Sequence, residues 1–200
     1  MAAARMHNKK PATLVACGIF ADELQAVLAE KGLAPEIVWL PAALHTDLDQ
    51  LQSELDSVLA AVTKRRRRPC VLYGSSCLPA AQELFQRHGA RGFAACNCIE
   101  ALVGREERQR YEAEGCFLMT PGWVRSWPAM MASLGWDGVD VRTNLGRYAK
   151  ILVFDAGVHP LTDEEVVAFF DLTGLFVETV ALRLDHFEAL ITRLLDQGGS

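Results

Sequence analysis

Three cysteines and one histidine follow apolar, strand-like runs of the chain. Cys17 ends "TLVAC", Cys77 ends "VLYGSSC" and Cys98 comes shortly after "GFAAC". His45 follows the run "PEIVWLPAAL". Thiolate and imidazole groups are the ligands that zinc prefers, and thiolates hold iron–sulfur clusters. These four side chains are therefore candidate metal ligands, with His45 or an exogenous ligand in the fourth position.

The ligands can meet only if the elements before them run side by side. Strands are predicted at 13–20, 35–44, 69–77, 92–96, 116–123, 149–157 and 175–182, and helices at 21–32, 47–68, 80–89, 98–115, 127–135, 162–174 and 185–197. This alternation predicts an α/β fold, a mostly parallel and doubly wound sheet of Rossmann-like form with helices on both faces. Ligands of such sheets bind beyond the carboxyl ends of the strands, where the four side chains would gather.

Composition and charge limit the classes of function. Half of the 200 residues are hydrophobic and the net charge is −5, so we expect a soluble protein without a basic field for nucleic acid. No apolar run approaches the roughly 20 residues of a membrane span. We interpret residues 1–12 as a loose tail, residues 13–200 as one domain, and the protein as cytoplasmic. Thiols stay reduced in that compartment, so structural disulfides are not expected.

The remaining cysteines have simpler interpretations. Cys70 and Cys116 begin strands, on the opposite rim of the predicted sheet, and are expected to be packing residues. Cys96 is predicted to finish a strand while Cys98 opens a helix, so their side chains would not share a face. Because a helix N-terminus lowers the pKa of a thiol, we expect Cys98 to favour the thiolate form.

Three further side chains are candidates for binding a cofactor. Trp123 follows a Pro-Gly pair at a predicted strand end, as a lid over a pocket or a packing residue at its rim. Asp155 ends another strand and would suit a ligand hydroxyl. Arg105 lies on the helix after Cys98 and could reach an anionic ligand. The basic run at 64–68 closes a helix, where cations complement the helix dipole, and is expected to be a solvated face.

An ordered set of short motifs carries a family resemblance. The motifs are "ACGIFADEL", "LPAALH", "YGSSC", "CNCIEALVGREERQRY", "LMTPGW" and "ILVFDAG". In this order they resemble an uncharacterised family with a domain of unknown function, whose genes often lie near those of corrinoid-dependent methyltransferases. The resemblance implies cysteine positions at Cys17, Cys77 and Cys98 and a histidine at His45. It also implies a small-molecule or methyl-carrier partner, and a methyltransferase or an accessory protein.

Three hypotheses remain open from the sequence. The first is a metal site that holds zinc or a [4Fe–4S] cluster. If the site is catalytic, one coordination position of the metal is open for substrate. The second is a non-catalytic module that binds haem or a corrinoid, with His45 or a cysteine as axial ligand and Trp123 in the apolar wall. The third is metal-free thiol redox chemistry at Cys98, although the C-x-C spacing is not the C-x-x-C motif. The oligomeric state is left open.

Overall fold

The computed structural model describes residues 11–79 and 81–196. Its strands are β1 (Ala12–Cys17), β2 (Glu36–Leu40), β3 (Arg68–Leu72), β4 (Arg91–Gly92), β5 (Cys116–Met119), β6 (Lys150–Asp155) and β7 (Val177–Ala181). Its helices are α1 (Ala21–Glu30), α2 (Leu48–Lys64), α3 (Ala81–His88), α4 (Cys98–Val103), α5 (Arg105–Ala113), α6 (Pro121–Leu134), α7 (Gly138–Leu145), α8 (Asp163–Thr173) and α9 (Asp185–Asp196). Two short 3-10 helices, η1 (Gly18–Phe20) and η2 (Ala42–Thr46), follow β1 and β2.

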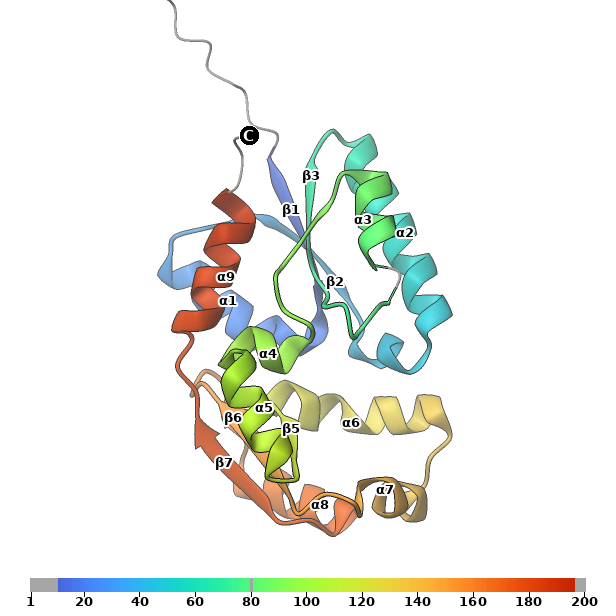
Figure 1. Ribbon diagram of the computed structural model, residues 1–200, viewed down its shortest axis with the longest axis vertical. Helices are drawn as coiled ribbons and strands as arrows, with labels where there is room; N and C mark the ends of the chain where they lie inside the picture. Colours follow the sequence, from blue (N-terminus) through green and yellow to red (C-terminus); the bar gives the residue numbers. More distant parts are fainter. Residues whose placement is uncertain (1–10, 80, 197–200) are drawn as a thin grey trace, which may run out of the picture.

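The strands form two parallel sheets within a single α/β domain. The first sheet has the order β2-β1-β3-β4 and the second the order β5-β6-β7. Figure 1 shows the first sheet in the upper half and the second in the lower half, with α4 and α6 between them. In the first sheet the chain moves from β1 to β2 on one side and to β3 on the other. The crevice beyond the ends of β1 and β3 is therefore a topological switch point, where α/β folds bind ligands.

Two hydrophobic cores correspond to the two sheets. The core of the first sheet includes Leu14, Leu72 and Phe187, and that of the second includes Val153 and Phe169. Phe187 belongs to α9, the last helix, so the chain returns to the first sheet after completing the second (Figure 1). The burial of these side chains stabilises the fold by about 25 cal/mol per Å² of apolar surface removed from water. The return of α9 ties the two halves together.

The predicted α/β class with parallel strands is confirmed, and the division into two sheets adds to it. The predicted β4 at 92–96 is much shorter, because it pairs only Arg91 and Gly92 with Cys70 and Val71 of β3. A strand of two residues offers few backbone groups with which a further strand could pair. The next strand, β5, instead pairs with β6 in a second sheet. Residues 1–10 and 197–200, part of the predicted tail and domain end, lie outside the described residues, as does residue 80 of the predicted helix 80–89.

The helices differ most from the predicted ones in three places. Helix α6 begins at Pro121 rather than at 127, because Thr120 caps it and Pro121 takes the first position, which places Pro128 inside the helix. The predicted helix 98–115 is broken at Gly104, whose φ of 84° favours glycine. The segment 136–148, which had no clear pattern, contains α7, started by a capping box at Asp137.

Within the described parts of the chain, every helix lacks the length or the apolar character that crossing a membrane would require.

The turn after β3 packs directly on the loop before α4, and this contact can be tested. A Cβ atom at Gly74 would lie 2.1 Å from the carbonyl oxygen of Cys96, which accepts a hydrogen bond from the Ser76 backbone N–H. We expect Gly74→Ala to lower the free energy of unfolding by at least about 2 kcal/mol, because backbone atoms must move. Urea unfolding measures this change.

The matched control is Gly138→Ala at the start of α7. A Cβ atom there meets no atom within 4 Å, so its stability should be unchanged or slightly higher. Equal unfolding midpoints for the two variants would contradict the close packing of the Gly74 turn.

Candidate metal centre

The four candidate ligands belong to strand ends or to the segments that follow strands. Cys17 is the last residue of β1, His45 lies in η2 after β2, Cys77 lies in the turn after β3, and Cys98 opens α4. The sulfur of Cys17 lies 3.9 Å from Nδ1 of His45. All six cysteines are free thiols.

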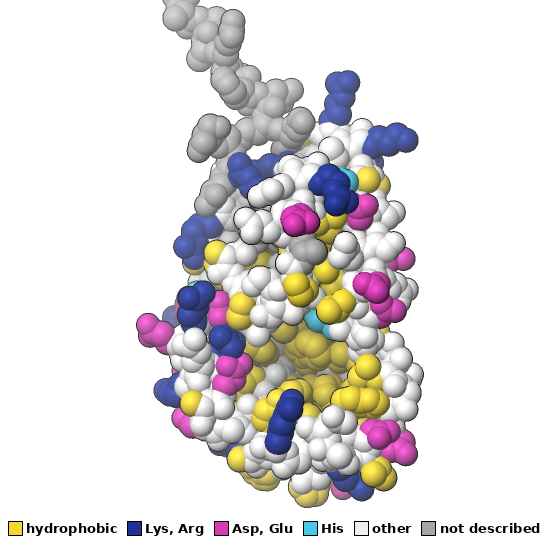
Figure 2. Space-filling model, turned by 45° about the vertical axis from the view of Figure 1, so that its right-hand side comes forward, with side chains coloured by type: hydrophobic (Ala, Val, Ile, Leu, Met, Phe, Trp, Pro, Cys, Tyr) yellow, Lys and Arg dark blue, Asp and Glu magenta, His cyan; other side chains and the backbone are white. Residues whose placement is uncertain are grey.

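A cavity of about 340 Å³ opens beside these residues, between the two sheets. Its lining residues from the first sheet's half are His45, Ser76, Cys77, Asn97, Cys98 and Ile99, and those from the second half are Glu112, Cys116, Phe117, Leu118, Met119, Trp123 and Tyr148. Figure 2 shows a hollow whose walls are mostly hydrophobic, with a histidine at its edge. A largely apolar cavity with a few converging polar groups is the usual form of a small-molecule site.

His45 is held in one tautomer. Its Nδ1 lies 3.0 Å from the carbonyl oxygen of Ala42, and because a carbonyl can only accept, Nδ1 carries the proton. Burial lowers the pKa of His45, so the ring is neutral near pH 7. The lone pair is then on Nε2, which makes no hydrogen bond with the described residues. Metal-bound histidines commonly donate their other ring N–H to a backbone carbonyl in this way.

Burial determines the protonation of the three thiols. Desolvation raises the pKa of Cys17 to about 11, and it also raises the pKa values of Cys77 and Cys98. The thiols also repel one another's charge, since Cys77 raises the pKa of both other thiols and Cys17 raises that of Cys98. The expectation that the helix N-terminus makes Cys98 a thiolate is therefore wrong, because α4 is short and burial outweighs its dipole.

N–H groups near the three sulfurs nevertheless favour the charged forms of the thiols. The backbone N–H groups of Ile19, Gly74 and Ile99 lower the pKa values of the three thiols, one each, against the larger effect of desolvation. The indole N–H of Trp123 donates to the sulfur of Cys98 at 3.0 Å. Hydrogen bonds of this kind stabilise the charged form of an acceptor and have less effect on the neutral form.

Trp123 and Tyr73 complete the surroundings of the thiols. Trp123 packs against the cores of both sheets, and its ring centroid lies 5.5 Å from that of His45. Tyr73, which follows β3, is buried, and its hydroxyl faces Cys17 without a hydrogen bond of ordinary geometry. The motif "YGSSC" could have indicated Tyr73 as a site residue, since a tyrosine that directly follows β3 lies at the switch point of the sheet.

The convergence of ligands is incomplete. In residues 11–79 and 81–196, no three His, Cys, Asp or Glu side chains surround a point where one metal ion would bind. Cys70 is a packing residue as expected, and its thiol donates to the carbonyl of Leu194. Cys116 is buried at the start of β5 but also lines the cavity, because β5 is an edge strand whose side borders it.

Cys96 belongs to a different set of contacts, which the sequence did not indicate. It lies in a loop rather than a strand, and its backbone N–H and thiol both donate to the buried carboxylate of Glu100. Burial would raise the pKa of Glu100, but donors from Cys96 and Arg108 together hold it below its usual value. This satisfied network fixes the loop that leads into α4.

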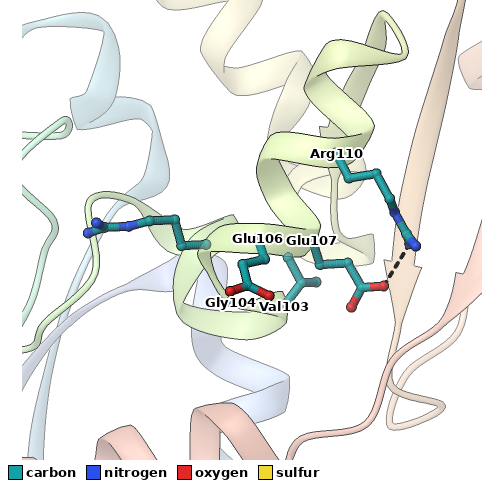
Figure 3. A pocket seen from close by; sticks show the side chains of 6 residues that line it. Val103, Gly104, Glu106, Glu107 and Arg110 are labelled. Atoms are coloured by element: carbon teal, nitrogen blue, oxygen red, sulfur yellow. Dashed lines mark hydrogen bonds and ion pairs between the residues drawn. The ribbon is translucent and has the colours of Figure 1, made fainter.

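Arg105 and Asp155 do not line the thiol cavity. The Arg105 side chain is 71% exposed and lies 3.6 Å from Glu100, at a charged pocket of the α4–α5 corner. Figure 3 shows this pocket, where Arg110 turns back to pair with Glu107. Asp155 ends β6, as predicted, and accepts the backbone N–H of Gly157.

A buried carboxyl group lies in α1, the helix that follows η1 in the chain. Glu23 of α1 is 4% exposed and its Oε2 has no hydrogen-bond partner among the described residues. Desolvation, with smaller contributions from Asp22 and Asp155, raises the pKa of Glu23 to about 7. Its pKa differs strongly from that of an exposed glutamate, so its ionisation opposes folding at neutral pH.

Comparison with known proteins gives a family. A family model described as "Protein of unknown function (DUF1638)" matches residues 39–191, which span the strand ends carrying His45, Cys77 and Cys98. The chain belongs to this family. That confirms the resemblance to a domain-of-unknown-function family, while the link to corrinoid-dependent methyltransferases stays a prediction. No curated protein matches the chain.

A solved structure of glutamate racemase from Aquifex pyrophilus is similar to this chain. The match has a TM-score of 0.43 and 15% sequence identity, and it covers 92% of this chain and 82% of the racemase.

The buried Glu23 predicts a pH-dependent stability. In the unfolded chain its pKa is near 4.5, so raising the pH ionises the unfolded state first and stability falls up to about pH 7. We expect Glu23→Gln to be more stable than the natural chain at pH 8, by on the order of 3 kcal/mol, with a much smaller difference at pH 5. Urea unfolding at the two pH values measures it.

Glu30→Gln is the control, because Glu30 is an exposed residue of the same helix. It should change stability little at either pH. The same stabilisation by Glu23→Gln at pH 5 and pH 8 would show that the ionisation of this carboxyl does not oppose folding.

Proposed function

We propose that Cys17, Cys77 and Cys98 hold a soft-metal centre, either an iron–sulfur cluster or zinc, beside a cavity that admits a small molecule. His45 lies next to Cys17 and offers Nε2 as a further ligand. The proposal unites thiols that are far apart in the sequence but belong to the ends of β1 and β3 and the start of α4.

One observation carries the proposal: the three buried thiols lie close enough to raise one another's pKa values, and the indole N–H donor of Trp123 faces the sulfur of Cys98 at 3.0 Å, while backbone N–H groups also favour the charged forms. Three neutral thiols have little need of such donors, whereas thiolates bound to a metal are stabilised by them. A cation would also relieve the mutual repulsion of the sulfurs, which otherwise keeps them protonated. Metal binding would therefore release protons from groups whose pKa values are raised without metal.

A zinc ion and a cluster ask for different spacings of the three sulfurs. Zinc needs its sulfurs about 2.3 Å from one point, and the described residues do not converge in this way. Each thiolate of a cluster binds a different iron, so the sulfurs lie farther apart. Three cysteines leave one iron of a [4Fe–4S] cluster free for His45 or a substrate.

Metal-free thiol chemistry is less well supported. A nucleophilic cysteine needs a lowered pKa, and burial raises the pKa values of all three thiols. His45 is not a base for Cys17, because the nitrogen nearest to the sulfur already carries a proton that it donates to Ala42. The C-x-C pair is also divided, since the thiol of Cys96 is turned to Glu100.

The experiment is purification without oxygen, followed by metal and sulfide analysis and a visible absorption spectrum. We expect bound metal, and a broad visible band if it is a cluster. Single changes of Cys17, Cys77 or Cys98 to Ser should each lower metal affinity by about tenfold or more. Trp123→Phe keeps the ring but removes the N–H donor to Cys98, and should weaken binding or shift the band.

Cys70→Ser is the matched control, because Cys70 is a buried strand cysteine outside the cavity. It should retain the metal. The proposal fails if the protein binds no metal, or if the three cysteine variants keep as much metal as the control.

A narrower proposal is that the site acts in or beside corrinoid-dependent methyl transfer, as the family resemblance implies. It is supported by a neutral His45 with a free Nε2 at the cavity, which could ligate a corrinoid or haem. We expect cobalamin to change its absorption spectrum when the chain is added, and His45→Ala to abolish the change. A spectrum that stays the same with both cobalamin and haem would reject this role and leave the metal centre untouched.

A further inference from the structure

β7 is an edge strand whose outer side has no neighbour among the described strands. It pairs only with β6, and Figure 1 shows it at the margin of the second sheet. Charged side chains commonly protect such an edge from association, as Glu36 of β2 does through ion pairs with Arg65 and Arg67. The charged residue of β7 is Glu178, and its carboxylate is already paired with Lys150 of β6. The outer edge of β7 is therefore open to pairing with another strand.

The hydrogen bonds to β6 determine which backbone groups of β7 face outward. The backbone N–H of Leu182, directly after β7, donates to the carbonyl of Asp155 of β6. Backbone groups alternate in direction along a strand, so those of Val177, Thr179 and Ala181 point away from β6. Among the described residues, nothing pairs with these outward groups. They form a row of alternating donors and acceptors.

The outer flank of α8 is apolar and exposed. Val167 and Phe170 are 58% and 46% exposed. On the opposite flank of the helix, Glu165 pairs with Arg125 of α6. A helix turns by about 100° per residue, so Val167 and Phe170 face away from α6. Because α8 packs on β7 and α6 packs on β6, this flank adjoins the outer edge of β7.

We propose that the outer edge of β7 and this flank of α8 bind a second copy of the chain about a two-fold axis. Antiparallel pairing centred on Thr179 places Thr179 opposite itself and Val177 opposite Ala181 of the second copy, so each outward group finds a partner. The second sheets of the two copies join into one continuous sheet. Phe176, which is 65% exposed, then lies opposite Leu182 of the second copy.

The lengths of α8 and β7 place both elements about the same axis. α8 has 11 residues and β7 has 5, so each is about 16 Å long. The axis through the middle of β7 therefore passes near the middle of α8, and the α8 helices of the two copies lie antiparallel. The flanks that carry Val167 and Phe170 then face each other across the axis.

Charge complementarity favours a second copy over an unrelated strand. Asp163 is exposed and lies four residues before Val167, on the same flank of α8. In the antiparallel pair it lies opposite Gly174 of the second copy. Arg142 lies beside Gly174, because a Cβ atom there would be 3.9 Å from its side chain. Its guanidinium donates to the carbonyl of Asp171 and has no carboxylate partner among the described residues, so it is available to Asp163 of the second copy.

The test is the mass of the 200-residue chain in solution, measured by light scattering after size exclusion at concentrations between about 1 and 100 µM. We expect a dimer with twice the chain mass of 22.0 kDa. Thr179→Pro removes an outward N–H but no hydrogen bond to β6, and should raise the dissociation constant of the dimer about tenfold or more. Thermal unfolding checks that this variant folds. Thr179→Ala is the matched control, because it keeps the N–H and should remain dimeric.

A charge exchange tests the orientation of the two copies independently. Asp163→Lys and Arg142→Glu should each weaken the dimer, because each places like charges opposite one another. The double variant restores opposite charges and should dimerise more tightly than either single variant. Phe170→Ser should weaken the dimer about tenfold, whereas Leu48→Ser, which alters an equally exposed residue of α2, should not.

Three results would overturn the proposal, which does not depend on a metal at the thiols. The chain is a monomer throughout the concentration range, or a folded Thr179→Pro variant dimerises as the natural chain does, or the double charge variant dimerises no more tightly than the single variants.

Discussion

The burial of three thiols where the two sheets meet is the constraint on which the other features of the site depend. Desolvation keeps Cys17, Cys77 and Cys98 protonated, and each would repel a charge on another. The surrounding N–H donors oppose this, and the indole of Trp123 crosses from the second half of the domain to do so. The site therefore has donors suited to thiolates, and the proposed metal would supply the positive charge that stabilises them.

The arrangement of the sheets explains why such a site can form. Cys17 ends β1 and Tyr73 follows β3, the two neighbouring strands at the switch point of the first sheet, and η2 brings His45 beside them. The second sheet contributes the facing wall through β5 and α6, and α9 holds the halves together by returning to the first core. A cavity lined from both halves can exclude water from the sulfurs and still admit a small molecule.

Much of this could be predicted from the sequence, and the exceptions have physical causes. Alternating strands and helices were enough to place Cys17, His45 and Cys98 near strand ends, because parallel strands share one rim. The burial of a side chain in the folded protein cannot be predicted from sequence spacing alone. The helix N-terminus predicted a lowered pKa for Cys98, and desolvation reverses that shift. The burial of the Glu23 carboxyl likewise depends on which residues surround it, and sequence spacing contains no such information.

The central claim is that three cysteine sulfurs share one metal centre. X-ray absorption at the metal edge, on protein purified without oxygen, tests it most directly. The account predicts a shell of at least three sulfur neighbours at about 2.3 Å, lost when Cys17, Cys77 and Cys98 are all changed to Ser. A shell of nitrogen and oxygen alone, or a sulfur shell that survives in the triple variant, would contradict it.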